Sequence, residues 1–519
     1  MIDYKDEKTW SLFKDGRTKG VFQLESNLGR SWSKKLAPEN LEELAALIAI
    51  IRPGCLKAII DGKSMTQRFV DRKNKLEDVT YLHDSLEEVL KPTYGVLVYQ
   101  EQSMRIAQKL AGFDLKKADD LRKAIGKKKA DLMAKIKEDF IVGCKEVGLV
   151  DSELATEIFG WIEKSSRYSF NKSHAVAYAV DSFWSAWYKA NHVNEFFLAY
   201  LSYANEKQDP HQEIYELVNE AKLFDIEVKV PKLNNFSEKF EMFGTDIQFG
   251  IRDIKGLTGV TGTKVMEAIT EVSNELGKDP AEFSWMDVLI YVAPNINSTA
   301  FKSLASIGFF STKATNVSRN KALYEYLIIR ELTKAEMNWL IDNYPKRKWD
   351  SLHECLLELA PTKKEGGGTS RQQRSQVVLN EAEMLHNPPY DLCDDPAWII
   401  EQENKFLGCP VSLARVESSD TSSANTSCLD VLNGKTGKDI CIAANVNRVN
   451  NHKVKKGKTK GKLMSFLTIE DSTCSIDNVV IFPEAREKYQ YVIYEGNNLL
   501  LCGEIQKNNS FIVDKVHEI

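Results

Sequence analysis

Residues 162–191 read IEKSSRYSFNKSHAVAYAVDSFWSAWYKAN and contain the start of a predicted helix. Ser173 is a suitable N-cap, and the residues after it favour a helix over 174–200. Lys172 and His174 would then lie beside free backbone N–H groups, where phosphate oxygens bind well. The stretch predicts an anion-binding helix start, and an ordinary helix start with a polar surface is the alternative.

Residues 1–205 have mainly helical patterning on both sides of this stretch. Asn40 and Glu43 resemble a capping box, and apolar residues then recur at helical spacing. Pro53 and Gly54 end that run. Further helices are predicted over 99–110, after Asp114, and over 130–146 and 152–164.

The remaining chain divides by its patterning into three regions. Residues 206–320 favour short helices separated by glycine turns, in the manner of two helical hairpins. Residues 321–430 include the polar stretches 363–376 and 417–427, which are typical of linkers. Residues 431–519 alternate apolar and polar residues in five short runs, which predicts a small barrel of the OB type. The predicted fold class is a multidomain, mainly α protein with a C-terminal β barrel.

The overall composition excludes several classes of protein. The chain has 519 residues, and no apolar run approaches the roughly 18 residues of a membrane span. The start, MIDYKDEKTW, has no apolar core of a signal peptide. The 9 cysteines include no C-x-x-C pair, so we expect neither a zinc ribbon nor a disulfide framework, and a reducing cytoplasm fits. A net charge of −5 limits nucleic-acid contacts to local basic patches.

Four segments follow one another in a characteristic order: GVFQLESNLGR (20–30), IIRPGCLK (50–57), PTYGVLVYQEQSMRIAQKLAGFDLKKADDLRKAIGKKK (92–129) and residues 162–191. Together they closely resemble the fingers of the DNA polymerase III alpha subunit, a C-family bacterial replicative polymerase. The resemblance continues more weakly through EQENKFLGCPVS (401–412) into the OB-like end.

The resemblance implies a function for each region. It implies polymerase fingers over 1–205 and a helix-hairpin-helix region that holds DNA over 206–320. It implies a helical segment with linkers and a possible clamp-binding peptide over 321–430, and an OB fold over 431–519. In the third region, EAEML (381–385) occupies roughly the place of the family's sliding-clamp peptide, but the family's Gln and Phe are replaced.

By resemblance, the start of the predicted helix binds the incoming deoxynucleoside triphosphate (dNTP). Arg167 would supply charge, and Tyr168 would supply a stacking or sugar-sensing face. The basic run over 116–129 would contact phosphates, and a solvated charged surface is the alternative. The predicted nucleotide-binding residues are Arg122, Lys123, Lys127, Lys128, Arg167, Tyr168, Asn171, Lys172, Ser173 and His174.

Predicted DNA contacts fall in three places. Lys255 and Gly256 lie in a glycine hairpin whose backbone N–H groups would hold duplex phosphates, or which is simply structural. Its glycines are spaced more loosely than is usual in the family. Arg52 is either a phosphate contact or a buried hydrogen-bonding arginine. The basic loop 452–462 lies between two predicted strands and is either a single-strand contact or a solubilising hairpin; its candidates are Lys455, Lys456 and Lys458.

Some conspicuous polar residues have no role that the sequence assigns. Gln23, Glu25 and Ser26 belong to the first family segment, and their individual roles do not follow from it. Gln100, Glu101 and Gln102 open a predicted helix, where structural support of the fingers is favoured over contact with the template.

Nucleotide addition requires metal ions, here Mg²⁺, held by carboxylates. The family's metal-binding aspartates lie in a palm domain upstream of the fingers, alongside a PHP domain. Asp119 and Asp120 lie within a basic helix, and Asp394 and Asp395 precede a proline, so both pairs are interpreted as surface groups. No catalytic or metal-binding residue is therefore assigned in this sequence.

The preferred hypothesis is a split polymerase in a bacterial or infected-host cytoplasm. A separate palm- and PHP-bearing polypeptide would hold Mg²⁺, while this chain would bind primer-template DNA and dNTPs. The alternatives are a non-catalytic DNA-binding remnant and an incomplete piece of one longer chain.

Overall fold

A computed structural model describes most of the chain, which forms two compact units, Met1–Phe196 and Phe197–Ile519. In the described part, no helix is both long enough and apolar enough to span a membrane. The described residues are 2–60, 62–127, 130–165, 168–364, 369–455, 457–506 and 510–519.

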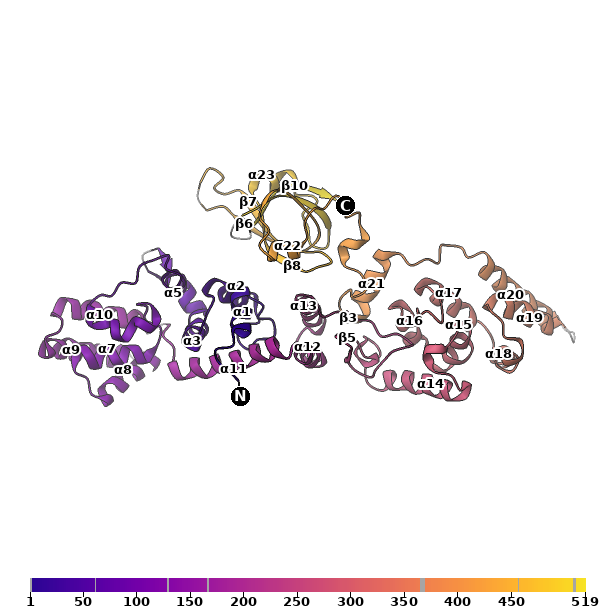
Figure 1. The fold of residues 1–519 in the computed structure, drawn as a ribbon, viewed down its shortest axis with the longest axis horizontal. Coiled ribbons are helices and arrows are strands. Elements are labelled where there is room, and N and C mark those ends of the chain that lie inside the picture. The colour runs from indigo at the N-terminus through magenta and orange to yellow at the C-terminus, as the bar shows by residue number, and fades with distance from the viewer. Residues whose placement is uncertain are drawn as a thin grey trace. The chain divides into compact units, whose positions relative to one another are not determined.

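The first unit is helical (Figure 1). Its buried residues form two separate hydrophobic cores. Its helices are α1 (Glu7–Asp15), α2 (Asn27–Leu36), α3 (Leu41–Ile50), α4 (Pro53–Lys57), α5 (Met65–Lys73), α6 (Glu87–Leu90), α7 (Gln100–Ala111), α8 (Leu115–Lys127), α9 (Ala130–Val147), α10 (Ser152–Ser165) and α11 (Lys172–Asn191). A two-stranded sheet, β1 (Ile59–Ile60) with β2 (Lys63–Ser64), lies between α4 and α5. One core joins α1–α5 to α11, and the other joins α7–α10.

Capping explains where α3 begins. The Asn40 side chain accepts a hydrogen bond from the Glu43 N–H at 2.9 Å, which is one half of the predicted capping box. The other half differs, because the Glu43 carboxylate accepts from the Glu39 N–H, in place of the Asn40 N–H, and from the Tyr94 hydroxyl. The predicted helix is confirmed, and its acid also ties the helix start to neighbouring segments.

The helix predicted over 174–200 is two helices, α11 and α12 (Val193–Ser202). Its N-cap is also corrected: Asn171 accepts from the His174 N–H at 2.9 Å, and Ser173 lies inside the first turn. Both residue types cap helices well, so the local sequence offered two equivalent starts.

The second unit contains helices, a small sheet and a barrel. Its helices of eight or more residues are α13 (Pro210–Lys222), α14 (Val260–Leu276), α16 (Ser298–Ser306), α17 (Arg319–Arg330), α18 (Lys334–Arg347), α19 (Leu352–Lys364), α20 (Thr369–His386) and α21 (Pro396–Leu407). Its shorter helices include α15 (Trp285–Asp287), α22 (Cys428–Leu432) and α23 (Pro483–Lys488). The sheet has the order β3 (Val228–Lys229), β5 (Asp246–Gln248), β4 (Glu241–Phe243).

The polar stretch 363–376 is not the linker that its composition predicts. Its described parts belong to α19 and α20, which lie side by side (Figure 1). Buried Leu356 and Leu359 of α19 and Val378 and Ala382 of α20 provide the packing that the Gly-rich composition did not indicate. Glu381 and Ala382 are 9% and 1% exposed within α20, so EAEML is helical and does not form a free clamp-binding peptide.

The carboxyl-terminal strands close into a barrel with the order β10-β8-β7-β6-β9, seen end-on in Figure 1. Strands β8 and β10 pair in parallel, the other neighbours are antiparallel, and α23 connects β8 to β9. This is the five-stranded OB topology that the alternating pattern predicted. The strands are β6 (Gly437–Lys453), β7 (Leu463–Glu470), β8 (Ser475–Ile481), β9 (Asn498–Ile505) and β10 (Phe511–Glu518).

The barrel contains one feature that the cysteine spacing did not predict. Cys441 of β6 and Cys502 of β9 are direct partners across the antiparallel pair and form a disulfide. Residues 61 positions apart meet here because of strand register, which no short cysteine motif encodes.

A buried ion pair joins distant helices of the second unit. The Arg319 guanidinium of α17 lies 2.9 Å from the Glu403 carboxylate of α21, with side chains 6% and 0% exposed. Glu403 also accepts from the N–H groups of Val411 and Ser412. The family segment EQENKFLGCPVS therefore has a structural role, because Glu403 fixes the chain that follows α21.

Candidate functional site

The first turn of α11 carries the main candidates of the first unit. Asn171 caps the helix, Lys172 and Ser173 follow it, and His174 donates its backbone N–H to the cap. The Lys172 side chain is 41% exposed, and His174 is also exposed. Two groups suited to anions thus meet at the N-terminus of a helix that is 20 residues long. The backbone N–H groups of Lys172 and His174 are not free as predicted, because the Glu101 and Asn171 side chains accept their hydrogen bonds.

Backbone hydrogen bonds between the segment before α7 and the segment before α11 hold this turn in place. The Phe170 N–H donates to the Val98 carbonyl at 3.0 Å, and the Gln100 N–H donates to the Phe170 carbonyl at 2.9 Å. The Glu101 carboxylate then accepts from the Lys172 N–H at 2.9 Å. The segment before α7 and the segment before α11 therefore position each other.

The Gln102 side chain fixes the backbone of the segment before α7. Its side-chain oxygen accepts from the N–H groups of Val98 and Tyr99, each at 2.9 Å. Its amide nitrogen donates to the Val89 carbonyl and the Thr93 hydroxyl. With Gln102 only 6% exposed, this geometry matches the structural support expected of the Gln100–Gln102 segment.

The Lys172 ammonium is held only loosely. It lies 3.6 Å from a Glu42 carboxylate oxygen and 5.7 Å from the centre of the Tyr99 ring. The Glu42 side chain is 62% exposed, and exposed ion pairs of this kind contribute about 0–1 kcal/mol. A polyanionic ligand could replace Glu42 at little cost.

An aromatic row runs past His174 along α11. The His174 ring lies 5.4 Å from the Phe170 ring and 4.1 Å from the Tyr178 ring, and Tyr178 stacks on Phe22 at 5.1 Å. Phe22 is 40% exposed. The Phe22 carbonyl accepts from Ser182 of α11, so the first family segment places this ring. Such a row offers ring faces beside the cationic turn.

Sequence reasoning missed Phe22, Phe170 and Tyr178, and although it favoured a supporting role for Glu101, it did not connect that residue with Lys172. A signal existed for Tyr178, which follows His174 by one helical turn and so shares its face. Glu101 comes from a segment 71 residues away from Lys172, and no local pattern announces that contact.

Tyr168, predicted for the nucleotide site, and Arg52, predicted as a possible DNA contact, both prove to be structural. Tyr168 is 8% exposed and belongs to the hydrophobic core, where burial raises its pKa to about 12, so it presents no stacking face. Arg52 donates to the Ala49 and Tyr168 carbonyls and covers the Phe170 ring at 4.0 Å. Of the two readings of Arg52, the geometry supports the hydrogen-bonding arginine.

The basic residues of α8 lie on the exposed side of a helix whose apolar residues belong to the other core of the first unit. Arg122 and Lys123 pair with Asp119 at 2.8 and 2.9 Å, and Lys123 also approaches Asp120. These carboxylates are thereby engaged by cations of their own helix. Arg167, Lys128, Lys456 and the side chain of Lys127 lie outside the described residues.

The other aspartate pair also has structural partners. Asp394 accepts from the N–H groups of Arg319 and Asn320 at the start of α17. Asp395 is the N-cap of α21 and accepts from the Trp398 N–H. Both carboxylates stabilise helix starts.

The predicted DNA contacts of the second unit lie at its surface. Lys255 and Gly256 are exposed in the turn between a 3₁₀ turn, Ile251–Asp253, and α14. Gly256 has φ +88°, which favours glycine, and a Cβ there would meet open space. Lys455 and Lys458 are exposed in the loop between β6 and β7. The structure therefore leaves these groups accessible to a ligand.

Comparison with known proteins decides the family. Residues 1–148 match the model of the bacterial DNA polymerase III alpha subunit finger domain. The DNA polymerase III alpha subunit of Borreliella burgdorferi is 32% identical over 527 aligned residues, which cover 100% of this chain. The chain belongs to the DNA polymerase III alpha subunit family.

Other alpha subunits align in the same way. The protein of Aquifex aeolicus is 43% identical over 68% of this chain, and that of Pseudomonas aeruginosa is 30% identical over 98%. The matches cover 29%, 42% and 41% of the Aquifex, Borreliella and Pseudomonas proteins, so the chain spans less than half the length of these alpha subunits.

Proposed function

We propose that this alpha-subunit-family chain binds the incoming dNTP and primer-template DNA for a template-directed DNA polymerase. The palm carboxylates and their Mg²⁺ are supplied by another polypeptide in the same bacterial or infected-host cytoplasm. The observation that carries this proposal is the α11 start, where the Lys172 ammonium, the His174 ring and a capped helix N-terminus meet. Triphosphate oxygens are the ligand that the two side chains and the positive end of the helix dipole suit.

The adjacent aspartates of this chain have structural partners. Among the described residues, no group of three or more His, Cys, Asp and Glu side chains could hold a metal ion. The two adjacent aspartate pairs form salt bridges with basic side chains or cap helices, as described above. We therefore assign nucleotide positioning to this chain and derive no metal-dependent step from it.

The α11 turn contributes charge and orientation to the proposed reaction. Lys172 would exchange Glu42 for phosphate oxygens, and the backbone of its turn is already fixed by Glu101 and Asn171. A preformed site of this kind stabilises charge without reorganisation. A DNA-binding remnant would not require such a turn, which favours the polymerase over that alternative.

Reconstitution tests this function. The purified chain should incorporate no nucleotide alone, and a palm-bearing chain encoded in the same genome should restore synthesis on a primed template. Lys172→Ala and His174→Ala should each impair the restored synthesis. Lys189 of the same helix is buried, so Lys189→Ala could disturb folding and is not a suitable control. Incorporation by this chain alone would refute the division of labour.

A matched control is the exposed Lys264 near the start of α14. Lys264→Ala removes a lysine from a helix start in the other unit and should leave dNTP use unchanged. Equal losses from Lys172→Ala and Lys264→Ala would mean that general positive charge, and not the α11 site, is responsible.

A further inference from the structure

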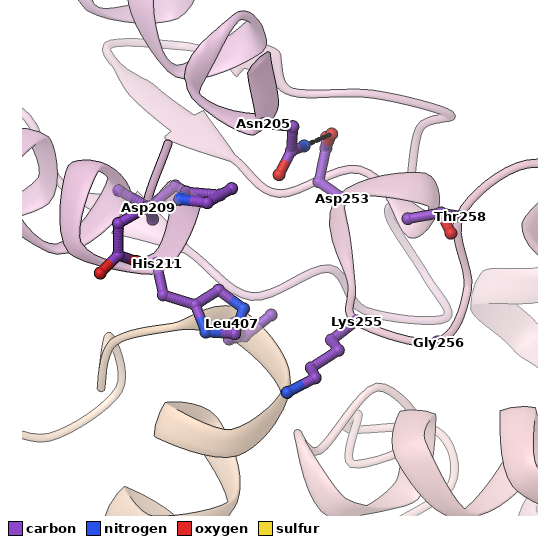
Figure 2. Close-up of a pocket in the computed structure, with 10 residues that line it drawn as sticks. Asn205, Asp209, His211, Asp253, Lys255, Gly256, Thr258 and Leu407 are labelled. Carbon is purple, nitrogen blue, oxygen red and sulfur yellow. Dashed lines mark hydrogen bonds between the residues drawn. The ribbon is translucent and has the colours of Figure 1, made fainter. Parts of the chain in front are cut away.

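The second unit contains a pocket of about 300 Å³ beside the glycine turn (Figure 2). It lies where the start of α13, the turn before α14 and the end of α21 converge. The residues used below are Asn205, His211, Ile214, Asp253, Lys255 and Leu407.

The apolar side of the pocket is firmly built. Ile214 and Leu407 are each 1% exposed. A Cβ at Gly408 would lie 3.0 Å from both Cα and Cδ2 of His211, so the glycine allows the end of α21 to close against this ring. The Lys255 N–H donates to the Phe406 carbonyl at 2.9 Å and joins the glycine turn to the same helix end.

The opposite side of the pocket carries an amide and a carboxyl group. The Asn205 amide nitrogen lies 3.5 Å from an Asp253 carboxylate oxygen, as Figure 2 shows. The second oxygen of Asp253 accepts from the Gly250 N–H at 3.2 Å. Burial raises the pKa of Asp253 to about 6. Together these groups offer both a donor and acceptors to a flat polar edge.

The charges limit the ligand. Lys255 contributes one ammonium, and in the described part of the chain no carboxylate lies within ion-pair distance of it. Asp209 and Asp253 also line the pocket. One ammonium beside two carboxylates disfavours a triphosphate, and it leaves room for a single phosphate only directly at Lys255, away from both acids.

We propose that this pocket binds one unpaired deoxynucleotide. The base would stack on the face of the His211 ring that is turned away from Gly408, its polar edge would face Asn205 and Asp253, and its phosphate would contact Lys255. The volume suits a ligand of this size. The inference rests on the proposed DNA-holding role of the glycine turn, and adds that this turn also captures a base.

Two sources could supply such a nucleotide, a single-stranded segment of DNA or the free nucleotide pool. The first probe is a single-stranded oligonucleotide carrying 2-aminopurine, whose fluorescence reports base stacking. The second is free deoxynucleoside monophosphate, measured by calorimetry. A blunt duplex without unpaired bases reports phosphate contacts alone.

The test compares the full chain with His211→Ala, Asn205→Ala and Lys255→Ala. Loss of base stacking in His211→Ala should weaken binding of the single-stranded probe about 5- to 100-fold, with blunt-duplex binding unchanged. Asn205 is exposed, so Asn205→Ala tests the same site with little risk to folding. Lys255→Ala should weaken binding of both DNA probes. His353→Ala, at a half-buried histidine of α19, is the matched control.

The outcomes separate this inference from the proposed function. Wild-type affinity of His211→Ala and Asn205→Ala for the single strand would overturn the pocket while leaving the DNA-holding turn intact. Failure of the wild-type chain to bind any DNA probe would overturn both. Binding of free monophosphate that is lost in His211→Ala, without binding of the oligonucleotide, would support the nucleotide pocket and assign it to the free pool.

Discussion

Replacing Gln102 with alanine should loosen the start of α11 without touching it. The substitution leaves the N–H groups of Val98 and Tyr99 without their buried acceptor. A buried polar group left unsatisfied costs about 1–3 kcal/mol, so two such groups cost about 2–4 kcal/mol after partial relaxation. Because Phe170 binds to this same backbone, the loss should extend to the segment before Lys172.

Hydrogen exchange followed by mass spectrometry measures this effect locally. A loss of 2–4 kcal/mol corresponds to roughly 30- to 700-fold faster exchange in peptides covering 96–102 and 168–174. Gln100→Ala is the matched control, because the hydrogen bond described for Gln100 uses its backbone N–H. Exchange in Gln102→Ala within about threefold of wild type, or equal effects of both variants, would refute the reasoning.

Three other substitutions test the second unit. Glu403→Gln should lower the stability of the unit by about 3–5 kcal/mol, since Arg319 loses its buried counter-charge; an unchanged thermal transition would show that the pair is dispensable. Burial lowers the pKa of Lys232 to about 8. Between pH 8 and about 10.5 the unfolded state therefore binds more protons than the folded state. The free energy of unfolding should rise by about 3 kcal/mol as the pH increases across that range. Lys232→Met should lack that rise in denaturant titrations at each pH, and a parallel rise in both proteins would assign it to other groups. Gly250→Ala places a Cβ 2.2 Å from the Lys239 Cα and should cost about 3 kcal/mol or more, whereas a wild-type melting temperature would mean that the backbone adapts freely.

The parts of the fold that follow local rules could be predicted from the sequence. Asn40 caps the start of α3 as expected, although Glu43 bonds to Glu39 and not back to Asn40, and the five alternating runs became the five barrel strands. These elements succeed because capping and period-two alternation act within a few residues. The prediction of a linker over 363–376 was wrong, because buried contacts between α19 and α20 overrode the polar composition.

The candidate site was predictable only in part. Lys172 and His174 stand at a helix start as expected, although Asn171, not Ser173, caps it. The groups that position this turn are remote in sequence, since Glu101 reaches it through tertiary structure. Tyr168 illustrates the opposite error, because a residue next to a site in sequence can point into the core.

The most direct test is a structure of this chain assembled with its palm-bearing partner, primer-template DNA and a non-hydrolysable dNTP. The account predicts that the Lys172 ammonium lies within about 4 Å of triphosphate oxygens, with His174 beside the same nucleotide and Glu42 displaced from Lys172. A dNTP bound at the palm metals with the start of α11 outside contact distance would contradict it.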